Sequence, residues 1–370
     1  MKGNFIFLAL LLAIVCAGCE DKDLCSPAFN PTTFDENIKA ALEGQVMGYA
    51  YVLTENGQVV KTGTLGKAQS SADGNIDMSL DLDMQVASIS KFITSTCAIH
   101  VCRLKGVPLT TAIGSYLPSG WARGAGIDNV TIAELISQTS GLTVPGTQSF
   151  GATQFDSLQV VVQNGATLPK TRSYTNTNAA LLRIVLPRLW DKYRPVTGAY
   201  DEAFCASTYK LMVQELLFDK ISITGDCMPS NGNQILAYSG ANDATGGSGA
   251  STDFSLVSGG TGWNLTCREL AKFWAYAWFS NDFINDEDKT WAKDNRADLW
   301  NSILGGKYGN YYCKLGGWNF TNAPTKSMNS VVMLFPNNYQ LTLFTNSPVP
   351  GGISLATLSM NAYDNAFNCK

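Results

Sequence analysis

Strand-like patterns occur at both ends of this chain, and helical patterns fill its middle. Residues 46–54 and 58–62 predict two strands around the turn Glu55-Asn56-Gly57, and 327–335 and 340–345 predict another pair. Apolar residues recur at helical spacing in 34–42, 88–104, 132–137, 178–190, 209–218, 268–279 and 353–367. We therefore predict an α/β (α+β) fold, with an antiparallel sheet built from both chain ends, flanked by helices and interrupted by a helical insertion.

This pattern divides the chain into an export leader and two folded parts. We predict a leader at 1–19, a sheet domain from 25–105 and 300–370, and an inserted helical domain at 106–299. A chain of 370 residues that is 45% hydrophobic can bury a large core. Its net charge of −4 and the absence of a Lys/Arg block exclude nucleic acid as an expected partner.

The N-terminus has the features of an export signal. Met1-Lys2 forms a short basic start, and residues 5–15 are apolar but too few for a lasting membrane span. The run Cys16-Ala-Gly-Cys19 resembles a bacterial lipobox, although Cys16 occupies the usual Leu position. We expect export, with lipid attachment at Cys19 to the cell envelope (as a periplasmic or outer-membrane lipoprotein) or plain secretion after Gly18.

Eight cysteines follow Cys19, and this even number behind an export leader predicts disulfides whose pairing the sequence leaves open. They are Cys25, Cys97, Cys102, Cys205, Cys227, Cys267, Cys313 and Cys369. No C-x-x-C or Cys/His spacing typical of zinc occurs after Cys19, and the chain has a single histidine. We predict no metal and no cofactor.

Ser88 and Lys91 are the first candidates for chemistry. They lie three residues apart where an apolar helical pattern begins, so the ammonium can reach the hydroxyl on one helix face. A serine hydroxyl becomes a nucleophile when a neighbouring amine, its pKa lowered by burial, accepts the proton. This arrangement is typical of acyl-transfer enzymes.

Two other residues test that interpretation. Ser207-Thr-Tyr-Lys210 repeats the spacing, but it opens an ordinary amphipathic helix, so we interpret Ser207 as structural. His100 lies twelve residues beyond Ser88 on the same predicted helix, roughly 18 Å away at about 1.5 Å per residue. It is therefore too far to serve as the base for Ser88.

Several ordered motifs resemble the serine β-lactamase and penicillin-binding superfamily. Val86-Ala-Ser-Ile-Ser-Lys91 is similar to its nucleophile motif, Tyr174-Thr-Asn176 to its Tyr-x-Asn motif, and Lys314-Leu-Gly316 to its Lys-Thr-Gly or His-x-Gly strand. Residues 131–142 and 262–273 are similar to two further family segments. The closest resemblance is to class C β-lactamases and to the related DD-carboxypeptidases and esterases, whose β-lactamase/transpeptidase-like fold we therefore expect.

The resemblance implies a role for each of these residues. Ser88 would be the nucleophile, and Lys91 and Tyr174 would share the general-base work, in an order that the sequence leaves open. The substrate-binding residues would be Asn176, Lys314 and Gly316, and the oxyanion hole would consist of the backbone N–H groups of Ser88 and Gly317. A lysine beside Tyr174 would lower the phenol pKa, and the Asn176 amide could hold Lys91. The terminal helices of the family pack together, which implies a Cys25–Cys369 disulfide.

Two positions depart from the family pattern. Gln138 replaces a frequent histidine in a segment that we interpret as mainly structural. Leu315 replaces a threonine or similar residue, which weakens the case for recognition of a β-lactam carboxylate.

We predict a serine hydrolase that cleaves amide or ester bonds in small-molecule or peptide substrates through a Ser88 acyl-enzyme. D-Alanyl peptides and β-lactam-like compounds are the favoured substrates. The alternatives are an esterase of small esters and a non-catalytic binder of cell-wall fragments. The oligomeric state stays open.

Overall fold

The computed structural model describes residues 27–142, 153–191, 200–230, 232, 234–249, 252–300, 302–320 and 325–368. The predicted leader, Cys19, Cys25 and Cys369 lie outside the described residues. Within the described part of the chain, no helix is both long and apolar enough to cross a bilayer.

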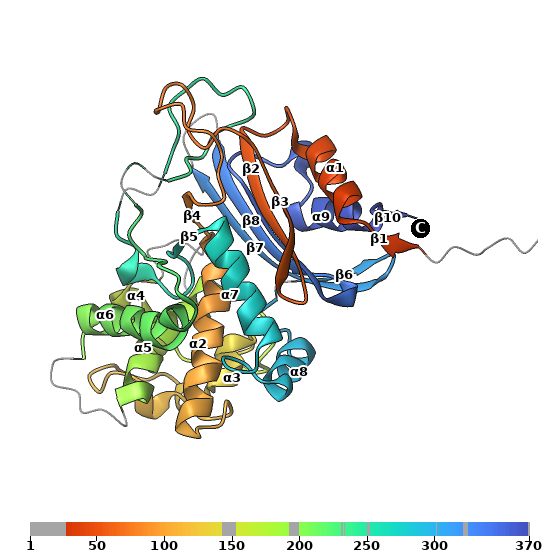
Figure 1. Cartoon of the computed structure of the whole chain (residues 1–370). Helices are drawn as coiled ribbons and strands as arrows, with labels where there is room; N and C mark the ends of the chain where they lie inside the picture. The colour runs from red at the N-terminus through yellow and green to blue at the C-terminus, as the bar shows by residue number, and fades with distance from the viewer. Residues whose placement is uncertain are drawn as a thin grey trace, which may run out of the picture.

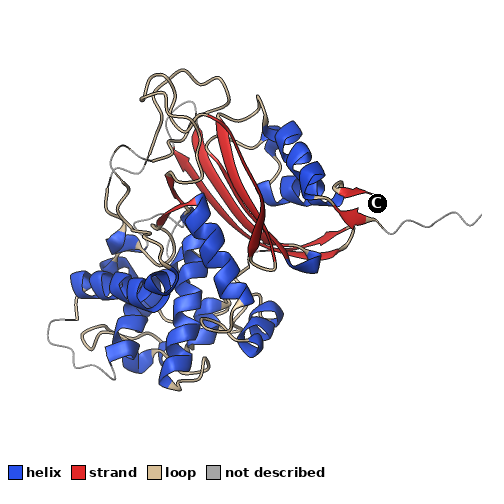
Figure 2. Ribbon diagram, in the orientation of Figure 1, coloured by secondary structure: helices blue, strands red, loops and turns tan. Residues whose placement is uncertain are grey.

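Six antiparallel strands form the central sheet, in the order β3-β2-β9-β8-β7-β6 (Figures 1 and 2). Their bounds are β2 Gly48–Glu55, β3 Gln58–Gly66, β6 Ser302–Gly306, β7 Gly309–Phe320, β8 Lys326–Leu334 and β9 Tyr339–Thr345. The two chain ends meet where β2 pairs with β9, from Tyr49 opposite Thr345 to Glu55 opposite Tyr339. This confirms the predicted sheet built from both ends of the chain.

Alternating side chains of the sheet face two different layers of helices. On one face, Tyr49, Tyr51 and Leu53 pack against α1 (Pro31–Leu42) and α9 (Leu355–Asp364). On the other, Ala50 and Val52 belong to a larger cluster that includes α7 (Cys267–Phe279) (Figure 1). Both faces are therefore buried, and every β2 residue from Gly48 to Thr54 is buried.

The remaining helices gather beside the sheet (Figure 2). They are α2 Ser90–Lys105, α3 Ile132–Ile136, α4 Phe155–Asn164, α5 Asn176–Asp191, α6 Glu202–Val213 and α8 Asp286–Asp294. Helix α2 packs against α5 and α6, and all its side chains from Ser90 to Cys102 are buried. We predicted that α2 belongs to the sheet domain, but it packs against two helices of the helical part. The predicted domain boundaries, between 105 and 106 and between 299 and 300, stay a prediction.

Strands β6 and β7 carry no alternating apolar pattern in the sequence. Each contains two or more glycines, and β7 has Lys314 in its interior. They are strands because β7 pairs with β8 from Tyr312 to Phe320, and β6 pairs with β7 from Gly309 to Cys313. Tertiary pairing therefore overrides weak local propensity here.

The last helix is shorter than its predicted span of 353–367. Ser354 caps its N-terminus by accepting a hydrogen bond from the Thr357 N–H, and Asn365 follows its last residue. The chain then enters β10 (Phe367–Asn368), which pairs with β1 (Ala28–Phe29). Two shorter strands, β4 (Asp83–Gln85) and β5 (Asn264–Thr266), pair in front of α2.

The six described cysteines are all buried free thiols, so none of them forms a disulfide. Burial raises the pKa of Cys97 and Cys102 to about 12, which makes these thiols unreactive near neutral pH. The β1–β10 register sets Ala28 opposite Asn368, so the described chain ends lie beside each other.

We predict that the mature protein contains one disulfide, between Cys25 and Cys369, because the described elements nearest to them in the chain, β1 and β10, are paired. Not counting Cys19, alkylation under denaturing, non-reducing conditions should add six groups, and prior reduction should raise the number to eight. Cys25→Ala should expose Cys369 and give seven. Eight additions without reduction would show that no disulfide forms.

Candidate active site

Ser88 lies in a tight turn, η1 (Ala87–Ile89), that connects β4 to α2. The preceding residue, Ala87, has φ 48°, in the left-handed region that costs a non-glycine residue about 1 kcal/mol or more. The Val86 N–H donates to the Trp263 carbonyl at 3.0 Å, which fixes the chain just before the turn. Ser88 is partly exposed at the surface, whereas the side chains that follow it are buried.

The buried side chain of Lys91 contacts the hydroxyl of Ser88. Its Nζ lies 3.0 Å from Ser88 Oγ and donates to Asn176 Oδ1 and to the Gly260 carbonyl, both at 2.6 Å. The side chain has no exposed surface, and this burial lowers the pKa of Lys91. A buried amine with a lowered pKa is suited to accept a proton from the serine.

Tyr174 lies between two ammonium groups. The Nζ atoms of Lys91 and Lys314 are 5.0 and 5.3 Å from the centre of its ring. Burial by itself raises the phenol pKa, but the charges of Lys314 and Lys91, together with a hydrogen bond to Ser88, outweigh it, so the pKa of Tyr174 is lowered. Tyr174 therefore has, like Lys91, a lowered pKa, the condition that suits a group to accept a proton near neutral pH.

Lys314 is fully buried and ion-paired. Its Nζ lies 2.9 Å from Asp298 Oδ1, and the two side chains are 0% and 1% exposed. Such a pair needs further hydrogen bonds to offset the desolvation of both charges, and Asp298 Oδ2 accepts one from Gln138 Nε2 at 2.6 Å. With no exposed surface, Lys314 is placed to act on Tyr174, and the substrate-binding role predicted for it stays a prediction.

Gln138 connects this ion pair to the Tyr174–Asn176 segment. Its Oε1 accepts from the Thr175 N–H at 2.9 Å and from Asn178 Nδ2 at 2.6 Å, while its Nε2 donates to the Thr175 carbonyl at 3.1 Å. Gln138 itself has φ 62°. The glutamine that departs from the family pattern thus holds both backbone groups of the residue between Tyr174 and Asn176.

Gly316 allows β7 to lie directly against the turn that carries Ser88. A Cβ atom at Gly316 would come within 2.2 Å of the Val86 carbonyl oxygen and 2.4 Å of Ser330 Oγ. Strand β6 pairs with β7 only as far as Cys313. Gly317, which is exposed, lies on β7 beyond this last pair. Leu315 points away from this site, toward the sheet face covered by α1 and α9.

The structure therefore brings the predicted residues Ser88, Lys91, Tyr174, Asn176 and Lys314 together, with Gly316 at their edge. Sequence reasoning missed Asp298 and the Gly260 carbonyl. Neither belongs to a recognisable motif, although Asp298 is the last acidic residue before Lys314 in the chain.

The two control residues lie elsewhere. Ser207 Oγ donates to the Ala203 carbonyl of its own helix at 2.8 Å, and Lys210 pairs with Asp226 at 2.5 Å. His100 is buried against Phe283, with ring centres 5.6 Å apart. Neither residue contacts the Ser88 cluster through any of these interactions.

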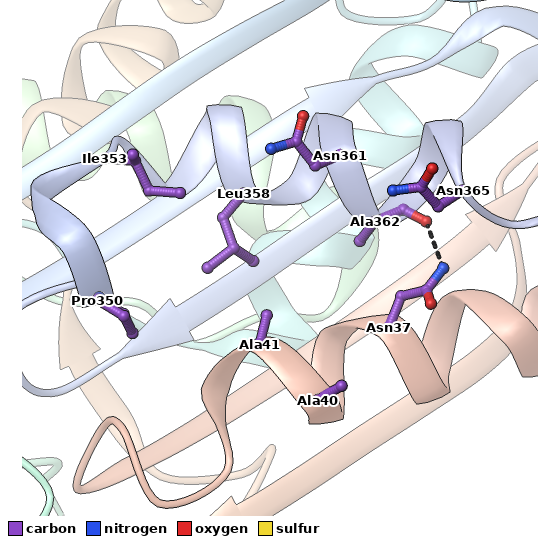
Figure 3. Close-up of a pocket in the computed structure, with 9 residues that line it drawn as sticks. All are labelled: Asn37, Ala40, Ala41, Pro350, Ile353, Leu358, Asn361, Ala362 and Asn365. Carbon is purple, nitrogen blue, oxygen red and sulfur yellow. Dashed lines mark hydrogen bonds between the residues drawn. The ribbon is translucent and has the colours of Figure 1, made fainter.

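A cavity of about 400 Å³ lies between α1 and α9 (Figure 3). Asn37, Asn361 and Asn365 line it together with small apolar side chains, and Asn37 Nδ2 donates to the Ala362 carbonyl at 3.0 Å. It is on the opposite side of the sheet from Ser88, so it takes no part in this site. In the described part of the chain, no three His, Cys, Asp or Glu side chains gather as a metal site.

We predict that breaking the buried Lys314–Asp298 pair costs far more stability than breaking an exposed pair. Asp298→Ala should lower the free energy of unfolding by about 3–5 kcal/mol, because it leaves a buried ammonium without its counter-charge. The control Asp81→Ala breaks the exposed Arg268–Asp81 pair and should cost less than about 1 kcal/mol. The double change Asp298→Leu with Lys314→Met should recover most of the loss in urea unfolding. Equal losses for Asp298→Ala and Asp81→Ala would refute the assignment.

Comparisons with known proteins agree with this geometry. Residues 34–203, which include Ser88, Lys91 and Tyr174, match the family model described as Beta-lactamase. No curated protein sequence matches the chain.

Solved structures share the fold over nearly the whole chain. A β-lactamase/D-alanine carboxypeptidase from Yersinia pestis is 19% identical, with a TM-score of 0.61 over 90% of this chain and 95% of its own. The hydrolase EstCE1, described as having promiscuous acyltransferase activity, is 12% identical, with a TM-score of 0.64 over 90% and 98%. D-amino acid amidase from Ochrobactrum anthropi SV3 is 15% identical, with a TM-score of 0.59 over 90% and 96%.

The family model covers the part of the chain that carries the nucleophile motif, and the shared fold extends over both ends of the sheet. Residues 34–203 thus match the Beta-lactamase family model, and the fold of the chain is similar to that of solved β-lactamases and D-alanine carboxypeptidases.

Proposed function

We propose that this protein is a serine hydrolase that cleaves ester or amide bonds through an acyl-enzyme at Ser88. The observation that carries the proposal is the contact of a partly exposed serine with a fully buried lysine, at 3.0 Å, beside a tyrosine of lowered pKa. A non-catalytic binder would have no need to hold an ammonium in this buried position, where desolvation is costly.

In acylation, Ser88 Oγ attacks the substrate carbonyl carbon and transfers its proton to the Lys91–Tyr174 pair. The bond from that carbon to the leaving oxygen or nitrogen then breaks, and the pair returns the proton to the leaving group. In the second step a water molecule gives a proton to the same pair as its oxygen attacks the acyl carbon. The bond from that carbon to Ser88 Oγ then breaks, the pair returns the proton to Ser88 Oγ, and the acid is released. The negative oxygen formed in each step would be held by the N–H groups of Ser88 and Gly317, and each such donor is typically worth about 3–4 kcal/mol.

The structural relatives support a range of substrates for this reaction. They include proteins named as a β-lactamase/D-alanine carboxypeptidase, as a D-amino acid amidase and as a hydrolase with acyltransferase activity. D-Alanyl peptides and β-lactam-like compounds stay among the candidates for this chain, and small esters are the alternative. The pairing of Lys314 with Asp298 favours the alternative, because it removes one cation from carboxylate recognition.

We predict that Ser88 alone carries the acyl group. Incubation with a fluorophosphonate, a penicillin and an activated ester should give covalent adducts detectable by intact mass, and Ser88→Ala should abolish them. Ser207→Ala is the matched control, because it has the same S-x-x-K spacing and should leave labelling unchanged. An adduct that persists in Ser88→Ala would disprove the assignment.

We predict that the rate of acylation falls as pH decreases through the pKa of the Lys91–Tyr174 pair, because the protonated pair cannot accept the serine proton. Since both pKa values are lowered, this acid limb should lie below the ordinary titration range of lysine and tyrosine. Lys314→Met removes a positive charge that lowers both pKa values, so the limb should move to higher pH whichever of the two is the base. Pre-steady-state acylation measured against pH would show this shift, and an unmoved limb would contradict the role given to Lys314.

A further inference from the structure

The described lysines around the candidate site are all held by partners within the protein. Lys91 donates to Asn176 and Gly260, and Lys314 pairs with Asp298. Lys326, at the start of β8 opposite Phe320, is buried; its Nζ donates to Thr245 Oγ1 at 2.9 Å and to the Gly246 carbonyl, and lies 3.9 Å from Asp243. An incoming substrate carboxylate would have to displace one of these buried partners, which is costly.

An aromatic surface continues from the site along β7. Residues two apart on a strand point to the same face, so Trp318 and Phe320 share the face of Lys314 and Gly316. Trp318 begins about 7 Å beyond Gly316, at about 3.3 Å per residue. The rings of Trp318 and Phe320 are stacked, with centres 5.8 Å apart, and both side chains are partly exposed.

Phe254 connects this surface to the opposite wall of the site. Its ring meets Trp318 edge-on, with centres 5.1 Å apart. Phe254 packs closely against Gly262, because a Cβ atom added to Gly262 would lie 3.0 Å from the Phe254 Cβ. Gly262 is two residues after Gly260, whose carbonyl accepts a hydrogen bond from Lys91. We call Phe254, Trp318 and Phe320 the aromatic face. It therefore spans from the Gly260 segment to β7, next to the Ser88 turn that Gly316 contacts.

We propose that the aromatic face is a binding subsite for an uncharged, apolar and preferably aromatic group next to the scissile carbonyl, and that the enzyme selects such esters and amides over carboxylate-bearing ones. This proposal rests on the proposed Ser88 acyl-enzyme and names its substrate class. Partly exposed aromatic rings bury substrate area favourably and stack on a second ring, whereas an anion beside them would lose its hydration without an ionic partner.

Among the described residues near Tyr174 in the chain, Arg172 is a cation that could supply such a partner. It is exposed and lies two residues before Tyr174 in the chain. An arginine that reaches the bound substrate can pair with a carboxylate, so Arg172→Ala is part of the test.

The test compares unactivated esters by proton release, so that the leaving group adds no aromatic ring of its own. Ethyl phenylacetate and benzyl acetate place a ring on either side of the ester, and ethyl acetate is the small reference. Monoethyl succinate and ethyl pentanoate form an anionic and neutral pair of similar length. Each kcat/KM is divided by the rate constant of alkaline hydrolysis of the same ester, to remove intrinsic reactivity.

We expect at least one aromatic ester to exceed ethyl acetate about tenfold or more, and monoethyl succinate to be no better than ethyl pentanoate. Trp318→Ala should lower the aromatic-to-ethyl-acetate ratio about tenfold, and Trp318→Leu, which keeps apolar volume, should lower it less. Asn319→Ala lies on the same strand but the opposite face and should leave the ratio unchanged. Fluorophosphonate labelling of Ser88 in each variant reports whether its site is formed.

Two results would overturn the subsite. One is a preference for monoethyl succinate that Arg172→Ala abolishes, which would assign carboxylate binding to Arg172. The other is an aromatic preference that is absent in the unmodified protein or unchanged by Trp318→Ala in a labelled enzyme. Failure of the proposed function would look different, because then no ester would be hydrolysed and the fluorophosphonate would not label Ser88.

Discussion

The pairing of β2 with β9 is the contact on which the rest of this structure depends. It joins a strand near residue 50 to one near residue 342 and so closes a single sheet from two distant pieces of chain. Once these strands are paired, β8 and β7 follow in register, and β7 reaches the Ser88 turn. The contact between Gly316 and Val86 exists because of that register, since a shift of one residue would turn Lys314 to the opposite face of the sheet.

The site concentrates buried charge to an unusual degree. Two lysines approach one tyrosine ring, and a single carboxylate, Asp298, neutralises only one of them directly. Burial and the repulsion between Lys91 and Lys314 both lower the pKa of Lys91. The same charges favour the phenolate form of Tyr174. These buried charges cost stability and lower the pKa values of Lys91 and Tyr174, a combination that is common at functional sites. Asp298 and Gln138 hold this arrangement in place.

Much of the sheet and the core of the site could be predicted from the sequence. The strands at 46–62 and 327–345 contain short apolar runs bounded by turn residues. Ser88 and Lys91 are three residues apart in the chain, so local spacing is enough to place one near the other. Tyr174 and Lys314 required the family resemblance, because 86 and 226 residues separate them from Ser88. Strand β6 was not predicted and β7 was expected only from the resemblance, since their local patterns are weak and long-range pairing decides their structure. The helices α4 and α8 were also not predicted, although α8 begins at a capping box, Asn285 with Asp288, which is a local signal.

The sequence by itself determined the sheet with a helical insertion and the Ser88–Lys91 pair, because hydrophobic period and residue spacing are local properties of the chain. Only the tertiary structure decided what Lys314 does. A lysine on a strand can face solvent, a substrate or another side chain, and its pairing with Asp298 depends on the packing of a loop sixteen residues away in sequence. The aromatic face is likewise a tertiary feature, because Phe254 and Trp318 meet only when the Gly260 segment packs beside β7. Contacts between distant segments are set by the register and packing of the whole fold, and no local pattern contains them.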